Sequence, residues 1–236
     1  MSNNFGWNPK VHESITRLAL EHVPVKLPHT ESIIEGVIDD RIPLHLFGIL
    51  DAKHCYAGEP LSSPSSRVKH SLDMYIDKLI DSMIDWELDN ENAAMKEIGE
   101  AVHLLQDIAD PLHTRKFYVS PLKFQPYRKY YKCADKIDIS EIITEKELNA
   151  VTDNFYDLYG DTYIKARRSP YPLRSKYIAR VPELMKKSIS NACASTVAFL
   201  KRLGNLHTMS DAYKTDAFAS EQASSKFLQK IREKNS

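Results

Sequence analysis

One short stretch of the sequence holds three residues of the types that bind transition metals. His103, Asp107 and His113 occur in the segment HLLQDIADPLH. Residues four positions apart lie one above the other on a helix, so His103 and Asp107 can bind the same cation. Imidazole nitrogen and carboxylate oxygen are both suitable zinc donors. Pro111 is expected to bend or end the helix, which lets His113 turn back towards the same cleft.

Three residues elsewhere in the chain are candidates to complete such a site. His12 lies at the border of an apolar stripe near the N-terminus, Asp40 follows a predicted helix, and His54 lies in the loop after it. Taken singly, they are explained equally well as a packed histidine, a helix-end carboxylate and a loop histidine. In the same way, spacing alone allows His103 and Asp107 to be an ordinary surface pair, with His113 unrelated to them.

The elements that must position these residues are predicted to be helices. Asn8 is a good N-cap, and Pro9 is favoured in a first helical turn. Apolar residues at helical spacing predict a second helix capped by Thr30, a third over about 68–84, and others near 92–110, 126–134, 140–158 and 180–203, with Gly204 as the stop of the last. No segment alternates as a strand does. The predicted fold class is therefore all-α, a helical bundle with long loops.

Bulk properties limit the classes of function. Lys and Arg number 32, as do Asp and Glu, so the net charge predicts neither nucleic-acid affinity nor strong attraction to an anionic membrane. The three cysteines lack CxxC spacing and are interpreted as free thiols of a reducing compartment. No signal peptide and no membrane-spanning apolar run is visible. We therefore expect a cytoplasmic protein, or a secreted one if a leader was removed, with no integral membrane segment.

Taken together, the candidate donors resemble the superfamily of zinc-dependent phospholipases C and single-strand-specific nucleases. The resemblance covers roughly residues 5–135. The spacings from Asp40 through His54 and His103 to His113 match the phospholipase branch, whereas the spacing from Trp7 to His12 resembles the nuclease branch. The resemblance implies a helical bundle that binds a cluster of zinc ions. The implied metal ligands are Trp7, His12, Asp40, His54, His103, Asp107 and His113.

By this resemblance the chain binds two zinc ions within a single helical domain over residues 1–208, followed by a helical tail over 209–236. The implied ligands of the first ion are Asp40, His54, His103 and Asp107. His12 and Asp107 would bind the second ion, with the Asp107 carboxylate bridging the two. In the family an N-terminal tryptophan also binds this ion through its free amine and its carbonyl. Trp7 is internal here, so either the first six residues are removed or the metal relies on the carbonyl and water.

A third zinc site is predicted to be weakened or absent. In the family its ligands are a histidine matched by His113 and a later pair of one histidine and one acidic residue. This chain has Tyr127 and Tyr131 at the positions of that pair. Neutral phenols, with pKa values near 10, are poor zinc ligands at neutral pH.

The function implied by the resemblance is zinc-dependent phosphodiester hydrolysis of the phospholipase C type, in which a metal-bound water attacks phosphorus. Asp40 would act as the catalytic base that orients this water. The substrate would be a phospholipid headgroup or a nucleotide, and transient contact with a membrane surface is compatible with it. The alternatives are a single-strand nuclease of the same superfamily and a degenerate, non-catalytic zinc-binding helical module.

Four residues are candidates for substrate binding. Lys10 and Arg41 take the places of a carboxylate and a tyrosine of choline-preferring phospholipases, so the sequence predicts a more anionic substrate, unless both side chains point to solvent. Tyr127 and Tyr131 belong to an aromatic and basic run, YRKYYK, that could stack on single-stranded nucleic acid. More often, such a run is a solvated helix face with buried tyrosines.

Overall fold

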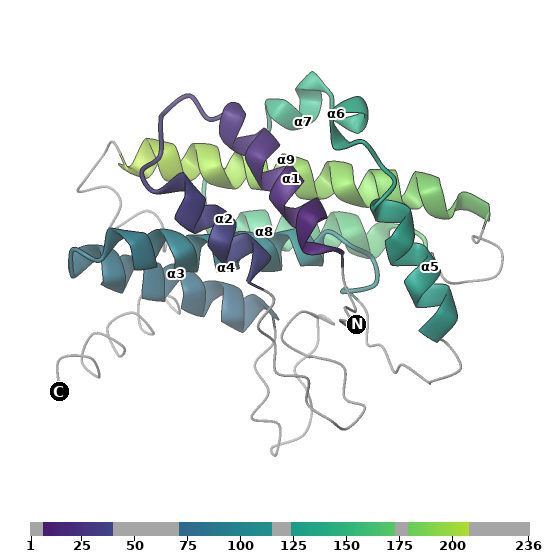
Figure 1. Cartoon of the computed structure of the whole chain (residues 1–236), viewed down its shortest axis with the longest axis horizontal. Coiled ribbons are helices and arrows are strands. Elements are labelled where there is room, and N and C mark those ends of the chain that lie inside the picture. Colours follow the sequence, from purple (N-terminus) through teal and green to yellow (C-terminus); the bar gives the residue numbers. More distant parts are fainter. Residues whose placement is uncertain (1–6, 40–70, 115–123, 173–178, 208–236) are drawn as a thin grey trace, which may run out of the picture.

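The computed structural model describes residues 7–39, 71–114, 124–172 and 179–207, with the backbone alone for 124–128 (Figure 1). These residues form helices and turns, and no strand occurs among them, which confirms the all-α prediction for this part of the chain. The helices are α1 (Pro9–Glu21), α2 (Thr30–Ile38), α3 (Ser71–Glu87), α4 (Glu91–Ile108), α5 (Phe124–Ala134), α6 (Ile139–Ile142), α7 (Glu145–Leu148), α8 (Phe155–Arg168) and α9 (Val181–His207).

Helix α4 lies at the centre of the packing. It contacts α2, α3, α8 and α9, while α1 packs against α2 and α9 (Figure 1). Its apolar positions were predicted to face inward and are buried: Ala94, Ile98, Ala101, Val102, Leu105 and Ile108. Burying one large apolar side chain stabilises a fold by about 1.5–3 kcal/mol. This apolar surface holds α4 in place, and α4 carries His103 and Asp107.

Helices α2 and α4 cross with their backbones in contact. Gly36 and Gly99 face each other at the crossing, and a Cβ atom on Gly36 would overlap the carbonyl oxygen of Lys96. Only glycine allows two helices to approach this closely. The approach brings the last turn of α2, which contains Val37, next to His103 on α4.

Capping side chains set several helix ends. The Asn8 side chain accepts a hydrogen bond from the backbone N–H of Lys10 at 3.0 Å, which confirms the predicted start of α1. The prediction that Thr30 caps the second helix is wrong by one position. Thr30 is already helical, and His29 precedes it with a left-handed φ of 46°. The His29 side chain instead pairs with Glu91 at the start of α4, at 2.9 Å.

Two other predicted boundaries are also wrong. The single helix expected over 140–158 is replaced by α6, α7 and the start of α8, because the side chains of Asp138, Thr144 and Asn154 each cap a new helix. Gly204 does not stop the last helix, which continues to His207. A Cβ atom on Gly204 would lie 3.3 Å from the side chain of Val23. Gly204 therefore serves close packing between α9 and the chain after α1.

None of the described helices is both long enough and apolar enough to cross a membrane. The predicted C-terminal tail over 209–236 lies outside the described residues, as do Asp40, Arg41 and His54.

Candidate metal centre

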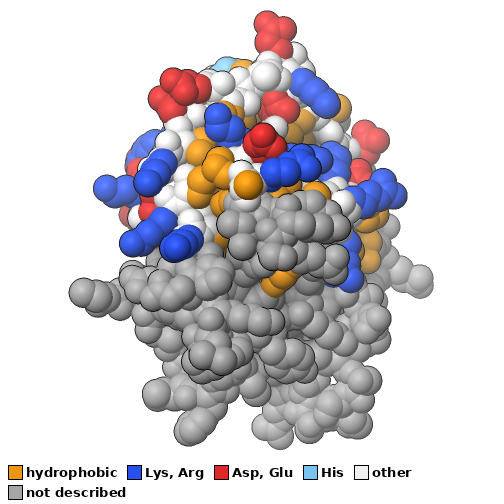
Figure 2. Space-filling view, turned by 90° about the vertical axis from the view of Figure 1, so that its right-hand side faces the viewer, with side chains coloured by type: hydrophobic (Ala, Val, Ile, Leu, Met, Phe, Trp, Pro, Cys, Tyr) orange, Lys and Arg blue, Asp and Glu red, His pale blue; other side chains and the backbone are white. Residues whose placement is uncertain are grey.

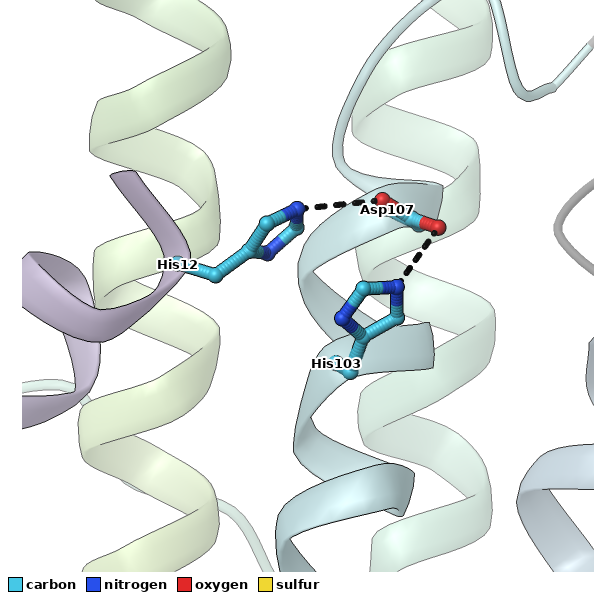
Figure 3. A group of neighbouring side chains, drawn as sticks. All are labelled: His12, His103 and Asp107. Atoms are coloured by element: carbon cyan, nitrogen blue, oxygen red, sulfur yellow. Dashed lines mark ion pairs between the residues drawn. The ribbon is translucent and has the colours of Figure 1, made fainter. Parts of the chain in front are cut away.

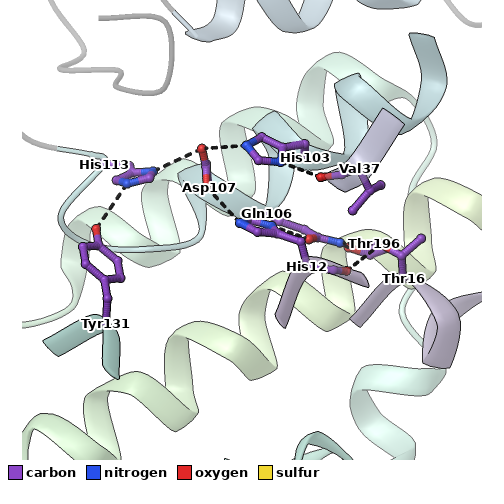
Figure 4. Close-up of polar contacts among 9 residues, drawn as sticks. All are labelled: His12, Thr16, Val37, His103, Gln106, Asp107, His113, Tyr131 and Thr196. Atoms are coloured by element: carbon purple, nitrogen blue, oxygen red, sulfur yellow. Dashed lines mark hydrogen bonds and ion pairs between the residues drawn. The ribbon is translucent and has the colours of Figure 1, made fainter. Parts of the chain in front are cut away.

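Three histidines converge on one buried carboxylate, that of Asp107, in the interior of the bundle. We call His12, His103, Asp107 and His113 the His–Asp cluster (Figure 4). His12 comes from α1, while His103 and Asp107 lie one turn apart on α4. His113 lies in the turns that follow α4, which ends three residues before Pro111. Each of the four residues is 9 % exposed or less.

The two carboxylate oxygens of Asp107 face imidazole nitrogens of the three histidines. His12 Nε2 lies 3.5 Å from Oδ1, and His103 Nε2 lies 3.4 Å from Oδ2 (Figure 3). His113 Nδ1 lies 3.6 Å from Oδ2. The rings of His12 and His103 stack, with their centroids 4.4 Å apart. Three donor-bearing rings from separate parts of the chain therefore surround a single carboxylate.

These distances match the spacing of ligands around a shared ion. A charge-assisted N–H···O bond measures about 2.7–2.9 Å, which is shorter than any of the three contacts. Two nitrogen or oxygen ligands on one tetrahedral zinc, with bonds of about 2.0–2.2 Å, lie about 3.3–3.5 Å apart. The donor atoms of His12, His103 and Asp107 all lie within 4.8 Å of one another. These three residues could therefore hold a metal ion.

A backbone contact determines which nitrogen of His103 faces the carboxylate as a bare base. His103 Nδ1 lies 2.8 Å from the carbonyl oxygen of Val37. A carbonyl oxygen only accepts hydrogen bonds, so Nδ1 carries the proton of the neutral ring and donates it to Val37. The lone pair of Nε2 is then directed towards Asp107. Nε2 and the carboxylate oxygen are both lone-pair donors, so a cation between them could accept from both.

Burial keeps His12 in the neutral, metal-binding form. The pKa of His12 is lowered to about 3, mainly because burial disfavours the charged ring and also because His103 lies beside it, although Asp107 acts in the opposite direction. His12 is therefore uncharged at neutral pH. Metal ligation requires this form of imidazole.

The turns that carry His113 are fixed by a second buried carboxylate. Asp110 Oδ1 accepts hydrogen bonds from the backbone N–H of Leu112 at 2.8 Å and from the hydroxyl of Tyr130 at 3.1 Å. Burial raises the pKa of Asp110 to about 6. His113 Nε2 lies 3.2 Å from the hydroxyl of Tyr131 on α5. His113 is thus held between Asp107 and a phenol.

Two other predicted site residues, Trp7 and Lys10, lie in different surroundings: Trp7 packs against the His–Asp cluster, and Lys10 lies away from it. Trp7 is buried against His12, with ring centroids 5.6 Å apart, and its indole N–H has no hydrogen-bond partner among the described residues. Lys10 is exposed and lines a groove between α1 and the residues after α5, outside the His–Asp cluster. Asp40, Arg41 and His54 lie outside the described residues, so their predicted roles stay predictions.

The aromatic and basic run of α5 separates by character. Tyr130 and Tyr131 are buried, whereas Lys129 and Lys132 are exposed. The end of the molecule towards which α5 lies shows Lys and Arg side chains interspersed with Asp and Glu (Figure 2). These two tyrosines face the core and offer no stacking surface for a nucleic acid. The side chain of Tyr127 lies outside the described residues.

Sequence reasoning missed Gln106, which lies beside Asp107 on α4. Its side chain is fully buried and bonds to His12 and to two threonines. A long polar residue among the apolar positions of a buried helix is the signal that could have identified it.

No protein-family model and no curated protein matches the chain.

Proposed function

We propose that the protein is a zinc-dependent phosphodiester hydrolase whose metal centre is built on the His–Asp cluster. The observation that carries the proposal is one buried carboxylate with three imidazole nitrogens at 3.4–3.6 Å from its oxygens. His103 presents a bare nitrogen to this carboxylate because the carbonyl of Val37 holds the proton of the ring on the other side. A shared cation would accept a lone pair from each of these two groups.

The donor set favours a transition metal such as zinc over magnesium or calcium. Magnesium and calcium prefer oxygen ligands alone, whereas imidazole with carboxylate suits zinc. His12 and His103 would bind through Nε2, and each Nδ1 already has a hydrogen-bonding partner of the kind that supports a metal-bound histidine. A bound divalent ion would also lower the cost of burying the Asp107 carboxylate.

The hydrolytic chemistry rests on the resemblance of the donor order to zinc-dependent phospholipases C. Bound zinc would lower the pKa of a coordinated water to about 7 and polarise the phosphoryl oxygens. The chain's own contribution is orientation, because the rings of His12 and His103 are buried and each is held by a hydrogen bond at Nδ1. In this proposal Asp40 and His54 complete the ligand set, and the substrate is a phospholipid headgroup or a nucleotide.

One observation favours a second candidate function, a zinc-binding module without catalysis. The hydroxyl of Tyr131 lies 3.2 Å from His113 Nε2, where the family has a further metal ligand. A neutral phenol supplies no negative charge to a third ion at neutral pH. The His113 side of the centre would then stabilise the fold and would not assist the reaction.

Metal analysis combined with a generic phosphodiester assay tests the proposal. The full chain, purified without added zinc, is expected to retain at least one equivalent of zinc and to hydrolyse bis(p-nitrophenyl) phosphate. Asp107→Asn is expected to lose both the zinc and the activity. Asp77→Asn changes another buried carboxylate, on α3 and outside the cluster, and is expected to keep both. Less than one equivalent of zinc in the wild type would refute the metal centre, and bound zinc without turnover would favour the non-catalytic module.

A further inference from the structure

Gln106 joins three helices through its side-chain amide. It is fully buried on α4 and contacts His12 and Thr16 on α1 and Thr196 on α9 (Figure 4). Its Oε1 lies 2.7 Å from His12 Nδ1. Its Nε2 lies 2.9 Å from the hydroxyl oxygen of Thr16 and 3.2 Å from that of Thr196. A primary amide has one accepting and one donating end, so its orientation decides what it offers to His12.

The two threonine hydroxyls fix that orientation. Thr16 donates its hydroxyl proton to the backbone carbonyl of His12 at 2.9 Å, and Thr196 donates to the carbonyl of Ala192 at 2.8 Å. A hydroxyl has a single proton, so each of these groups can only accept a hydrogen bond from Gln106. The NH₂ end of the amide must therefore face the threonines, and its carbonyl oxygen must face His12.

The orientation of the amide in turn fixes the tautomer of His12. A carbonyl oxygen only accepts, so the proton of the neutral imidazole lies on Nδ1, which donates to Gln106 at 2.7 Å. Nε2 is left as a bare base, 3.5 Å from Asp107 Oδ1. The Asp107 carboxylate competes for the same proton from the other side of the ring. If that proton moved to Nε2, the metal-binding nitrogen of His12 would be blocked.

We propose that Gln106 is a positioning residue that holds His12 as the Nδ1–H tautomer and so keeps Nε2 available as a ligand. The consequence for metal binding rests on the proposed function. The tautomer itself does not, because it is a property of the metal-free protein. Two backbone carbonyls orient the hydroxyls of Thr16 and Thr196, these hydroxyls orient the Gln106 amide, and the amide fixes the proton on Nδ1 of His12.

Nitrogen NMR of the metal-stripped full chain measures the tautomer directly. In protein labelled with ¹⁵N-histidine, two-bond ¹H–¹⁵N correlations distinguish a protonated nitrogen from a bare one, and the His12→Asn spectrum identifies the signals of His12. The wild type is expected to show protonated Nδ1 and bare Nε2. In Gln106→Met the acceptor that remains beside His12 among the described residues is Asp107, so the proton is expected to move to Nε2.

Two further variants separate this effect from a general loss of packing. The ionised carboxylate of Gln106→Glu can only accept, so this variant is expected to keep the proton on Nδ1 of His12. The double variant Thr16→Val with Thr196→Val removes the groups that orient the amide and is expected to give a mixture of both tautomers. Thr162→Val is the matched control, because Thr162 is a buried threonine whose hydroxyl bonds to Ser195, outside this network, and it is expected to leave His12 unchanged.

Chelator competition measures the consequence for the metal centre. Gln106→Met is expected to bind zinc about 10–100-fold more weakly, the range typical of a lost partner of a metal-binding histidine. A wild-type His12 protonated on Nε2, or a His12 that keeps its Nδ1 proton in both Gln106→Met and the double threonine variant, would overturn the proposal. A chain that binds no zinc but shows the expected tautomers would refute the metal centre and leave the role of Gln106 standing.

Discussion

The two sides of the His–Asp cluster differ in how firmly the protonation of their histidines is fixed. On one side, His12 and His103 each donate from Nδ1 to a carbonyl oxygen, of Gln106 and of Val37, which can only accept. On the other side, His113 contacts the hydroxyl of Tyr131, which can either donate or accept. On the His12–His103 side, the proton of each neutral ring is therefore fixed on Nδ1, and Nε2 is left unprotonated. The Tyr131 hydroxyl, by contrast, is compatible with a proton on either nitrogen of His113.

This difference teaches that proximity to a carboxylate is not enough to make a histidine a good ligand. All three rings lie at a similar distance from Asp107. Among the described contacts, the carbonyl partners of His12 and His103 exclude the wrong tautomer, whereas the hydroxyl partner of His113 accepts either one. Partners behind a ligand histidine determine whether its inward nitrogen is free to bind. We therefore expect the His12–His103 side to dominate metal affinity, with His113 as a secondary contributor.

The largest expected effect on zinc affinity comes from substituting a ligand histidine. The comparison is between two single variants, one on each side of the His–Asp cluster. His103→Asn should weaken zinc binding about 100-fold or more, because even a lost outer partner costs about 10–100-fold and this change removes the ligand itself. His113→Asn should weaken it by about 10-fold or less. Competition with a chromogenic chelator gives both values. Equal losses in the two variants would show that the sides are equivalent.

Separating α2 from α4 should weaken zinc binding on the His12–His103 side of the cluster. Gly36→Ala places a Cβ atom against the carbonyl of Lys96, so α2 must shift and carry Val37 away from His103. Overpacking of this kind costs about 1–3 kcal/mol, and zinc affinity should fall with it.

Gly160→Ala is the control for that prediction, because a Cβ atom on Gly160 in α8 has no atom of the described residues within 4 Å. It should stabilise the protein by about 0.5–1 kcal/mol and leave zinc binding unchanged. Urea unfolding and chelator competition measure the two quantities. Wild-type zinc affinity in a destabilised Gly36→Ala protein would disconnect the helix crossing from the metal centre.

Acid should lower the free energy of unfolding through His12, on the His12–His103 side of the cluster. The pKa of His12 is about 3 in the folded protein and 6.5 as its ordinary value. Below pH 6.5 His12 binds a proton in the unfolded chain, whereas in the folded chain it stays neutral until the pH approaches 3. The stabilising contribution is therefore complete above pH 6.5 and is lost progressively as the pH falls towards 3, by up to about 1.4 kcal/mol per pH unit.

Urea unfolding of the metal-free protein at several pH values between about 7.5 and about 4.5 tests this pH dependence. The raised pKa of Asp110 acts in the opposite direction, since its folded carboxyl keeps a proton up to about pH 6. Comparison with His12→Asn cancels that contribution. The variant should lose less stability on acidification than the wild type, and equal slopes would argue against a neutral, buried His12.

The smallest effect is expected from the Tyr131 hydroxyl. Tyr131→Phe removes one hydrogen bond to His113 and should lower the free energy of unfolding by about 0.5–1.5 kcal/mol. Zinc affinity should change by less than about 3-fold, well below the loss typical of an outer partner of a metal ligand. A 10-fold or larger loss would make the phenol part of the metal centre and erase the contrast between the two sides.

The sequence by itself determined the all-α class of the described residues, the apolar face of α4 and one half of the centre. Helical periodicity is local, so the apolar face of α4 was predicted from Ala94 to Ile108, and the spacing of His103 and Asp107 placed them on one side of it. Helix ends were less predictable. Gly204 has the sequence character of a stop, yet it lies within α9 because α9 packs there against Val23.

Only the tertiary structure decided which nitrogens face the carboxylate. His12 and Gln106 are 94 positions apart in the chain, and they meet because α1 and α4 both pack in the core with α2 and α9. The carbonyl of Val37 reaches His103 because two glycines let α2 and α4 touch. Residue types and spacing name the atoms able to bind a metal. The side of each ring that keeps its proton depends on backbone and amide groups brought there by packing, which spacing along the chain does not encode.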